Sequence, residues 1–264
     1  MPDPLSQLES EHGLSLYFEV DGKRWLMDVG SSPMFLRNAR KMGIDIAAVD
    51  FLILSHAHAD HTGGLRAFLE ENSKATVLLS SHIEGAHYYS TRRGSKRDIS
   101  IDYQLIEEHR SRFMFVCENW APSPSVRFFT ILPHRYPAPA ANATLMADDS
   151  ADDFRHELAV EIHHGGEGIL LSSCSHAGIL NTLAATSDRI KAYIGGLHLV
   201  DSDAEHQFET DEELERMAST LRTDYPALKI YTGHCTGAHA VSVLRTALLP
   251  RFDTFHTGAT ISIE

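Results

Sequence analysis

The sequence has no long apolar run, few cysteines and a deficit of positive charge. None of its apolar stretches approaches the roughly 20 residues of a transmembrane helix, so we expect no membrane span. The polar segment 1–12 lacks a basic stretch followed by an apolar one, which predicts no secretory signal. Three irregularly spaced cysteines, Cys117, Cys174 and Cys235, argue against a disulfide framework and favour a reducing, cytoplasmic location.

The formal net charge of -13 excludes a strongly basic surface. Such a field repels nucleic acid and anionic lipid, so we expect neither a nucleic acid nor a membrane as partner. A small-molecule substrate is the expected partner, and the sequence leaves open whether copies of the chain form a homo-oligomer. The densest basic cluster contains four residues: Arg92, Arg93, Lys96 and Arg97. It is either a solvated loop or a substrate-binding clamp for an anion such as phosphate.

Strand and helix patterns alternate along all 264 residues. Asp21-Gly22 between two apolar-rich runs predicts a hairpin. Pro33 and Gly43 mark the start and stop of a helix. The predicted strands are 14–20, 23–28, 50–55, 76–80, 113–117, 126–132, 157–163, 168–173, 191–194, 229–232 and 260–263. The predicted helices are 33–43, 65–71, a segment ending near 186, 204–222 and a segment ending near 248.

Two stretches interrupt this alternation. Residues 82–112 are polar and charged without strand periodicity, which predicts an inserted cap or lid. Residues 133–153 are rich in proline and alanine, which predicts a long surface loop. Two halves of strands with interleaved helices predict an α/β fold, with two packed sheets, outer helices and a single domain over residues 1–264.

The residues with the clearest chemistry lie in one loop after the strand at 50–55. It contains His56, His58, Asp60 and His61, and two glycines follow. Residues two apart on an extended backbone point the same way, so His56 and His58 can reach one metal together. Asp60 and His61 then turn toward a neighbouring position. Imidazole and carboxylate ligands suit zinc, iron or manganese.

The pattern His56-x-His58-x-Asp60-His61 resembles the signature of the metallo-β-lactamase superfamily. Three further segments, 173–179, 195–199 and 232–237, resemble its dihydropterin–ribofuranosylaminobenzene-phosphate synthase-like branch. The resemblance covers the whole chain in element order. It implies a four-layer αββα sandwich of two mixed sheets with external helices. It also implies one or two ions at one edge of the sheets, with zinc expected and manganese or iron as alternatives.

The resemblance assigns roles residue by residue. His56 and His58 match the ligands of the first metal, and Asp60 and His61 match those of the second. His234 matches the last histidine ligand, the alternative being a helix-capping or core histidine. Asp28, at a strand exit, is expected to orient a ligand histidine through its other ring nitrogen.

The rest of the metal shell departs from the superfamily pattern. His176 stands where a bridging aspartate is usual, and a histidine cannot bridge two metals as a carboxylate does. Cys174 is either a thiolate ligand or a small buried residue. His134 is the nearest candidate for the middle histidine ligand. His198 is either a catalytic, substrate-contacting residue or a structural one.

A metal ion lowers the pKa of its bound water toward neutrality. The sequence therefore predicts an enzyme that hydrolyses an ester, lactone or phosphoester of a small anionic substrate through a metal-bound hydroxide. Asp60 would be both ligand and proton acceptor. One alternative is a pterin-condensing transferase that displaces diphosphate, with the basic cluster assisting. A second alternative is a non-enzymatic metal-binding or sensing protein on the same scaffold.

Overall fold

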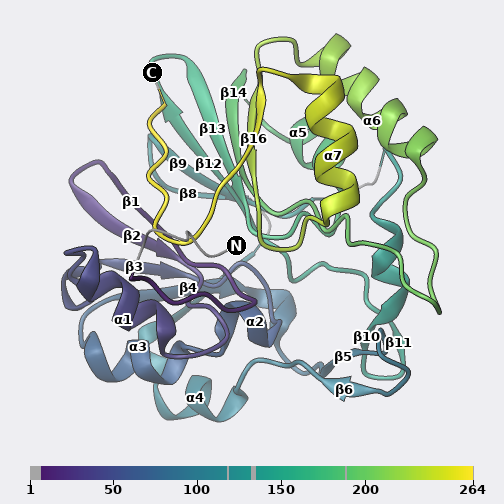
Figure 1. The fold of residues 1–264 in the computed structure, drawn as a ribbon. Coiled ribbons are helices and arrows are strands. Elements are labelled where there is room, and N and C mark those ends of the chain that lie inside the picture. Colours follow the sequence, from purple (N-terminus) through teal and green to yellow (C-terminus); the bar gives the residue numbers. More distant parts are fainter. Residues whose placement is uncertain (1–6, 118, 132–134, 188, 264) are drawn as a thin grey trace.

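Two β-sheets face each other across an apolar layer, and helices cover their outer sides (Figure 1). The structure, a computed structural model, describes residues 7–117, 119–131, 135–187 and 189–263. Within these ranges, no helix combines the length and the apolar character that crossing a bilayer requires. The predicted αββα arrangement of two mixed sheets with external helices is confirmed.

The first sheet has five strands, of which only the first pair is antiparallel. In spatial order they are β1 (Leu16–Val20), β2 (Lys23–Met27), β3 (Phe51–Ile53), β4 (Thr76–Ser80) and β7 (Phe113–Val116). The outer helices include α1 (Met34–Lys41), α3 (Leu65–Glu71) and α4 (Tyr103–Glu108). Their buried apolar residues pack on this sheet, which holds the helices in place.

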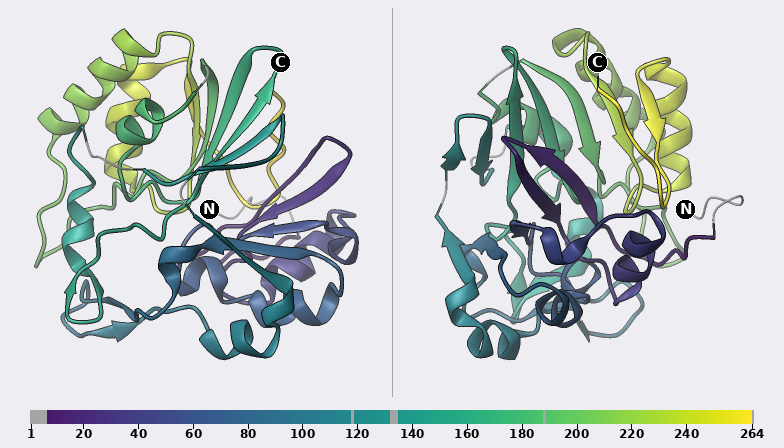
Figure 2. Two further views of the ribbon diagram at one scale, coloured as in Figure 1. Left: turned by 180° about the vertical axis from the view of Figure 1, so that it is seen from behind. Right: turned by 90° about the vertical axis from the view of Figure 1, so that its left-hand side faces the viewer.

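The second sheet has seven strands. In spatial order they are β16 (Phe252–Thr254), β15 (Lys229–Thr232), β14 (Ile190–Gly195), β13 (Glu167–Ser172), β12 (Ala159–His164), β9 (Val126–Phe129) and β8 (Trp120–Ser123). Outside it lie α5 (Ile179–Ala184), α6 (Asp211–Asp224) and α7 (Ala238–Leu248), as Figure 2 shows from two further sides. β13 to β16 are parallel neighbours.

Two predicted elements are wrong in extent or position. The helix predicted over 204–222 begins only at Asp211, because the side chain of Thr210 caps it and Glu213 returns the bond. The strand predicted at 260–263 is not formed. The last strand in the described residues is β16, which pairs with β15. Beyond it the backbone N–H of Phe255 still donates to the Thr232 carbonyl, and no further strand forms up to residue 263.

The two irregular stretches of the sequence meet in a small third sheet. β5 (Tyr88–Ser90) and β6 (Arg97–Asp98) come from the segment predicted as a lid. β10 (Leu145–Ala147) and β11 (Ser150–Ala151) come from the segment predicted as a loop, and β10 pairs with β5. The loop prediction is therefore wrong, because β10 forms by pairing with β5, which lies far away in the sequence, and β11 then pairs with β10. The backbone N–H of Ala59 donates to the carbonyl of Ile99, which ties this unit to the histidine-rich loop.

The carboxyl ends of the parallel strands meet at one place. β2 and β3 of the first sheet and β13, β14 and β15 of the second all end there. Side chains that follow these ends therefore converge, as is usual for ligand sites in sheets with parallel strands. Of the metal-ligand candidates expected from the sequence, all those within the described residues follow one of these ends.

Candidate metal centre

The histidine-rich loop leaves β3 and is held by Asp28 at the end of β2. The buried Asp28 carboxylate accepts from the Ser55 backbone N–H (2.8 Å), the Ser55 hydroxyl (2.7 Å) and His61 Nδ1 (2.8 Å). Because the carboxylate accepts at Nδ1, the hydrogen of a neutral His61 lies there and Nε2 keeps its lone pair. Asp28 therefore directs a ligand nitrogen of His61 into the centre.

Glycines allow this loop to pack closely. After α2 (Ala59–Thr62), a Cβ on Gly63 would lie 2.2 Å from the Ser31 carbonyl oxygen. One on Gly64 would lie 2.3 Å from the Val29 carbonyl oxygen. Neither contact is sterically tolerable, so both positions require glycine.

Several site residues have a left-handed backbone. Asp28, Ser175, His198 and His234 have φ values of 64°, 54°, 50° and 41°. Non-glycine residues seldom adopt this conformation, which costs on the order of 1–3 kcal/mol each and is concentrated at functional sites. The packing around the strand ends therefore holds these residues in a strained but defined orientation.

The first ligand group consists of His56, His58 and His176. Their ring centroids are 4.6 to 5.1 Å apart. Each Nε2 is buried without a hydrogen-bond partner in the described part of the chain. Buried polar atoms nearly always have a partner, so three such nitrogens on neighbouring rings fit a metal ion.

Burial also sets the protonation state of this group. It lowers the pKa of His58 to about 4, and the pKa values of His56 and His176 lie well below the usual value for the same reason. Neutral imidazole is the form that binds metal. The three rings are therefore ready to act as ligands at neutral pH.

The second ligand group consists of Asp60, His61 and His234. His234 Nε2 lies 2.9 Å from His61 Nε2 and 3.3 Å from Asp60 Oδ2. Burial opposes the ionised form of Asp60, but electrostatic interaction with His61 holds the pKa of Asp60 well below the usual value. Burial likewise opposes the charged form of His61, but Asp60 and Asp28 raise the pKa of His61 well above its usual value, so a metal ion must displace the His61 proton to bind at Nε2. The group thus contains one carboxylate and two imidazoles, a donor set suited to zinc, manganese or iron.

Cys174 lies between the two groups. Its Sγ is 3.2 Å from His61 Nε2, and it can share an ion with His56 and His176 or with His61 and His234. Burial raises the pKa of this thiol well above its usual value, and a divalent ion would favour the thiolate. Among the described residues, Cys174 therefore occupies the place expected for a shared ligand.

Two residues near His58 had not been predicted from the sequence. Asp152 Oδ2 lies 3.0 Å from His156 Nε2 and 3.7 Å from His58 Nε2, and the three can share an ion. His156 Nδ1 accepts from the backbone N–H of Ala57, between the two ligand histidines. The sequence feature that could have identified these two residues is an aspartate and a histidine four residues apart just before a strand.

Glu157 supports the first group from the backbone side. It accepts from the backbone N–H groups of His176 and Ala177, at 2.9 and 3.2 Å. Burial raises the pKa of Glu157 to about 7. The chain that enters β12 therefore fixes the segment that carries His176.

A third unexpected residue is His12. Its Nε2 lies 3.2 Å from Asp60 Oδ2, and its ring lies 4.8 Å from that of His234. Glu11 anchors this segment by accepting from the backbone N–H groups of Ser31 and Ser32, both at 3.1 Å. No local pattern identifies His12, because only tertiary packing brings it to Asp60.

A cleft of about 410 Å³ opens over both groups. His58, Asp60, His176 and His198 line it together with Arg92, Arg93 and Arg97. Lys96 is directed elsewhere, since its Nζ pairs with Asp149 at 2.9 Å. Three of the four predicted cations are therefore brought to the site. His134 lies outside the described residues.

Buried His198 stands beside the first group, with its ring 4.2 Å from that of His176. Its backbone N–H donates to Cys235 Sγ at 3.2 Å. Arg92 Nη2 lies 3.4 Å from His198 Nε2, and Arg92 Nε is buried without a partner in the described structure. The guanidinium group is thus held at the cleft with hydrogen-bonding capacity to spare.

Comparisons with known proteins agree with this geometry. The model of the metallo-β-lactamase superfamily matches residues 11–178, more than half of the chain. A metal-dependent hydrolase of the β-lactamase superfamily has a similar structure, with a TM-score of 0.79 at 26% identity. That alignment covers 97% of this chain and 94% of the other.

Two curated relatives are also similar. The chain is 25% identical to 7,8-dihydropterin-6-methyl-4-(beta-D-ribofuranosyl)-aminobenzene-5'-phosphate synthase of Methanocaldococcus jannaschii, over 96% of this chain and 90% of that protein. It is 38% identical to a metal-dependent hydrolase of Staphylococcus epidermidis over 88 residues, which cover 32% of this chain and 35% of that protein. The resemblance found in the motifs is confirmed, and the chain belongs to the metallo-β-lactamase superfamily of metal-dependent enzymes.

Proposed function

We propose that this enzyme hydrolyses an ester, lactone or phosphoester bond in a small anionic substrate. One or two divalent ions would assist, zinc first and manganese or iron as alternatives. The main support is the set of three buried, unpartnered Nε2 atoms of His56, His58 and His176. The second group and the cleft adjoin it. These residues would hold the ions.

When bound, such ions lower the pKa of water and polarise the bond to be cleaved. The chain's own residues prepare the site for this chemistry. Asp28 keeps the hydrogen of His61 on Nδ1, and burial keeps the first group neutral. Asp60 adds an ionised carboxylate beside His61 and His234.

Arg92 supports the choice of an anionic substrate. Among the described residues, no carboxylate lies within ion-pair distance of its guanidinium group, although Arg92 is half-buried at the cleft. A buried cation without a counter-ion favours binding of an anion. In the proposed complex, Arg92 binds the anionic part of the substrate and His198 Nε2 holds the guanidinium in place.

Metal analysis combined with turnover tests this function. We expect the purified protein to contain a divalent ion and to hydrolyse some member of a panel of 4-nitrophenyl esters, lactones and bis(4-nitrophenyl) phosphate. His58→Ala should lose both the ion and the activity. His82→Ala is the control, because His82 is an exposed histidine outside both groups. Metal binding without any turnover would instead support a sensing role.

A pterin-condensing transferase is the second candidate. It is supported by the relative of Methanocaldococcus jannaschii, which matches almost the whole chain, and by a cleft that Arg92, Arg93 and Arg97 line. Three arginines suit a diphosphate leaving group. Release of pyrophosphate from dihydropterin diphosphate would favour this candidate, and neither binding nor release would exclude it.

A further inference from the structure

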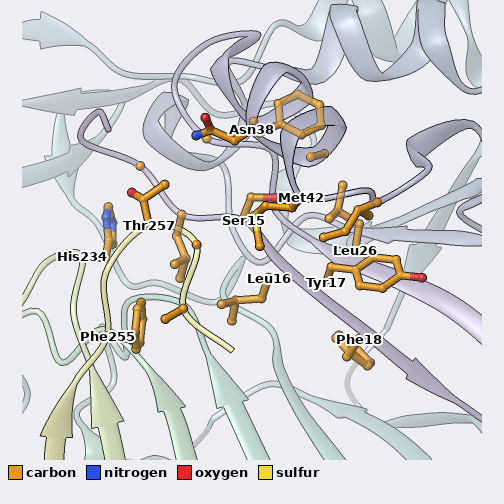
Figure 3. Close-up of a pocket in the computed structure, with 18 of the residues that line it drawn as sticks. Ser15, Leu16, Tyr17, Phe18, Leu26, Asn38, Met42, His234, Phe255 and Thr257 are labelled. Atoms are coloured by element: carbon orange, nitrogen blue, oxygen red, sulfur yellow. The ribbon is translucent and has the colours of Figure 1, made fainter. Parts of the chain in front are cut away.

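A second, larger cavity of about 730 Å³ begins at His234 and extends between the two sheets. Its walls come from the N-terminal segment, β1, α1, the inner face of β12 to β14 and residues 255–263. Figure 3 shows His234 and Phe255 toward one end and Tyr17 and Phe18 toward the other. The volume lies within the range of small-molecule cavities, about 300–1,000 Å³.

Most of the residues that line this cavity are apolar. Leu16 and Phe18 line one side, and Ile169, Leu171 and Ile194 line the opposite sheet. Among the described residues, no lysine or arginine lines it. Its two acidic residues are engaged in the chain, since Glu9 pairs with Arg37 and Glu11 accepts from the backbone of residues 31 and 32.

The apolar layer between the two sheets is not completely packed at this cavity. Leu16, Phe18, Ile169 and Ile194 belong to that layer but stay partly exposed, because they face the cavity. After β16, the backbone N–H of Phe255 donates to the carbonyl of Thr232 in β15, and residues 256–263 lie outside any strand. The odd-numbered residues from 255 to 263 are half-buried and line the cavity, and the exposed His256, Gly258 and Thr260 line it as well. An apolar occupant would remove this surface from water, which is favourable.

The cavity adjoins the candidate metal centre. His12 lines both the cavity and the cleft, and His234 lies at the end of the cavity and in the second ligand group. A molecule seated in the cavity can thus present one end to the metal centre. The other end would lie among aliphatic and aromatic side chains, where a charged group would lose its hydration without a partner.

We propose that this cavity binds a linear, uncharged alkyl or acyl chain and seats the apolar end of an amphipathic substrate. The first half of this proposal, that the cavity binds such a chain (the binding half), does not depend on any activity. The second half, that the chain belongs to a substrate (the substrate half), rests on the proposed hydrolase function. In that reaction a water oxygen bonds to the acyl carbon and the bond from this carbon to the leaving oxygen breaks. The leaving oxygen takes the proton of the water.

Displacement of a neutral fluorescent probe tests the binding half. The purified, metal-containing protein is titrated with N-phenyl-1-naphthylamine, which is then displaced by 1-alkanols from four to ten carbons. We expect fluorescence to rise on binding and the alkanol affinity to increase by about fourfold per methylene, the value for burial of one CH₂ group.

Two variants narrow the cavity from different segments of the chain. Thr257→Trp places an indole in it from the C-terminal segment, and Leu16→Phe places a phenyl ring in it from β1. Each should weaken probe binding at least tenfold while the protein still melts cooperatively. Ser262→Trp is the matched control, because Ser262 is exposed on the same segment and does not line the cavity. It should bind the probe as the unmodified protein does.

The proposal is overturned if the unmodified protein binds no probe, if affinity does not depend on alkanol length, or if both cavity variants bind normally. Its failure is separable from failure of the hydrolase function. His58→Ala should lose ester hydrolysis and keep probe binding, because His58 does not line the cavity. Among 4-nitrophenyl esters, kcat/KM should rise with acyl length in the unmodified protein and not in Thr257→Trp.

Discussion

Replacement of Asp28 by asparagine is expected to weaken metal binding with little loss of fold. Asparagine tolerates the left-handed φ of 64° at this position and keeps one oxygen for the Ser55 backbone N–H. Its amide nitrogen, however, would face His61 Nδ1, which is now 2.8 Å from a carboxylate oxygen. Because an N–H can only donate, the hydrogen of His61 would move to Nε2.

This change turns a ligand nitrogen into a donor inside the second group. Loss of a residue that orients a metal ligand typically reduces metal affinity about 10–100-fold, and we expect that range here. The unfolding free energy of the metal-depleted protein should fall by only about 1–3 kcal/mol, the cost of a buried hydrogen bond that is no longer properly made.

Competition with a chromophoric chelator measures the zinc affinity of Asp28→Asn. Asp50→Asn is the control, since Asp50 immediately precedes β3 of the same sheet but pairs with Lys74 at 2.8 Å, away from the site. It should bind zinc within about twofold of the unmodified protein. Unchanged zinc affinity in Asp28→Asn would refute the argument that Asp28 sets the ring of His61.

Three further predictions concern the cleft, the shared thiol and the N-terminal segment. Arg92→Gln should raise KM for an anionic substrate about 10–100-fold, the value of one hydrogen bond to a charged group, whereas Lys96→Gln should leave KM nearly unchanged in steady-state assays. Cadmium-loaded protein should show ultraviolet thiolate-to-metal absorption, and Cys174→Ser should lose it; a persisting band would exclude Cys174 as ligand. A hydrogen bond from Arg37 lowers the pKa of Glu9 from 4.5 to about 2. The interaction of Glu9 with Arg37 stabilises the folded protein fully above about pH 4.5, and this stabilisation is lost as the pH falls toward 2. The difference in Tm between the unmodified protein and Glu9→Gln should therefore shrink over that pH range in circular dichroism melts.

Local sequence was sufficient to predict the parts of the site that lie close together along the chain. The spacing of His56, His58, Asp60 and His61 predicted two adjacent ligand pairs. In the structure the rings of His56 and His58 lie 4.6 Å apart, and His61 Nε2 lies 3.5 Å from Asp60 Oδ2. The strand patterns also predicted the exits on which His176 and His234 lie. The carboxyl ends of parallel strands meet at one edge of a sheet. Predicting the strands from their alternating apolar pattern was therefore enough to suggest that His176 and His234 lie near each other.

The sequence was insufficient where a residue reaches the site from a remote segment. The strand β10 forms only because β5 pairs with it, and composition alone predicted a loop there. Asp152 follows that unit and was therefore missed. His12 was missed because Glu11 anchors its segment to the turn after β2, a contact without any local pattern.

The sequence by itself determined the superfamily, most of the strands and helices of the two large sheets, and the candidate ligand residues of the histidine-rich loop, since these depend on periodicity and short spacings. Only the tertiary structure decided how the ligand groups are assembled. It brought His176 to His56 and His58, put Cys174 between the groups and left an apolar cavity behind His234. These features depend on how two sheets and their loops pack, which no local stretch of the chain specifies.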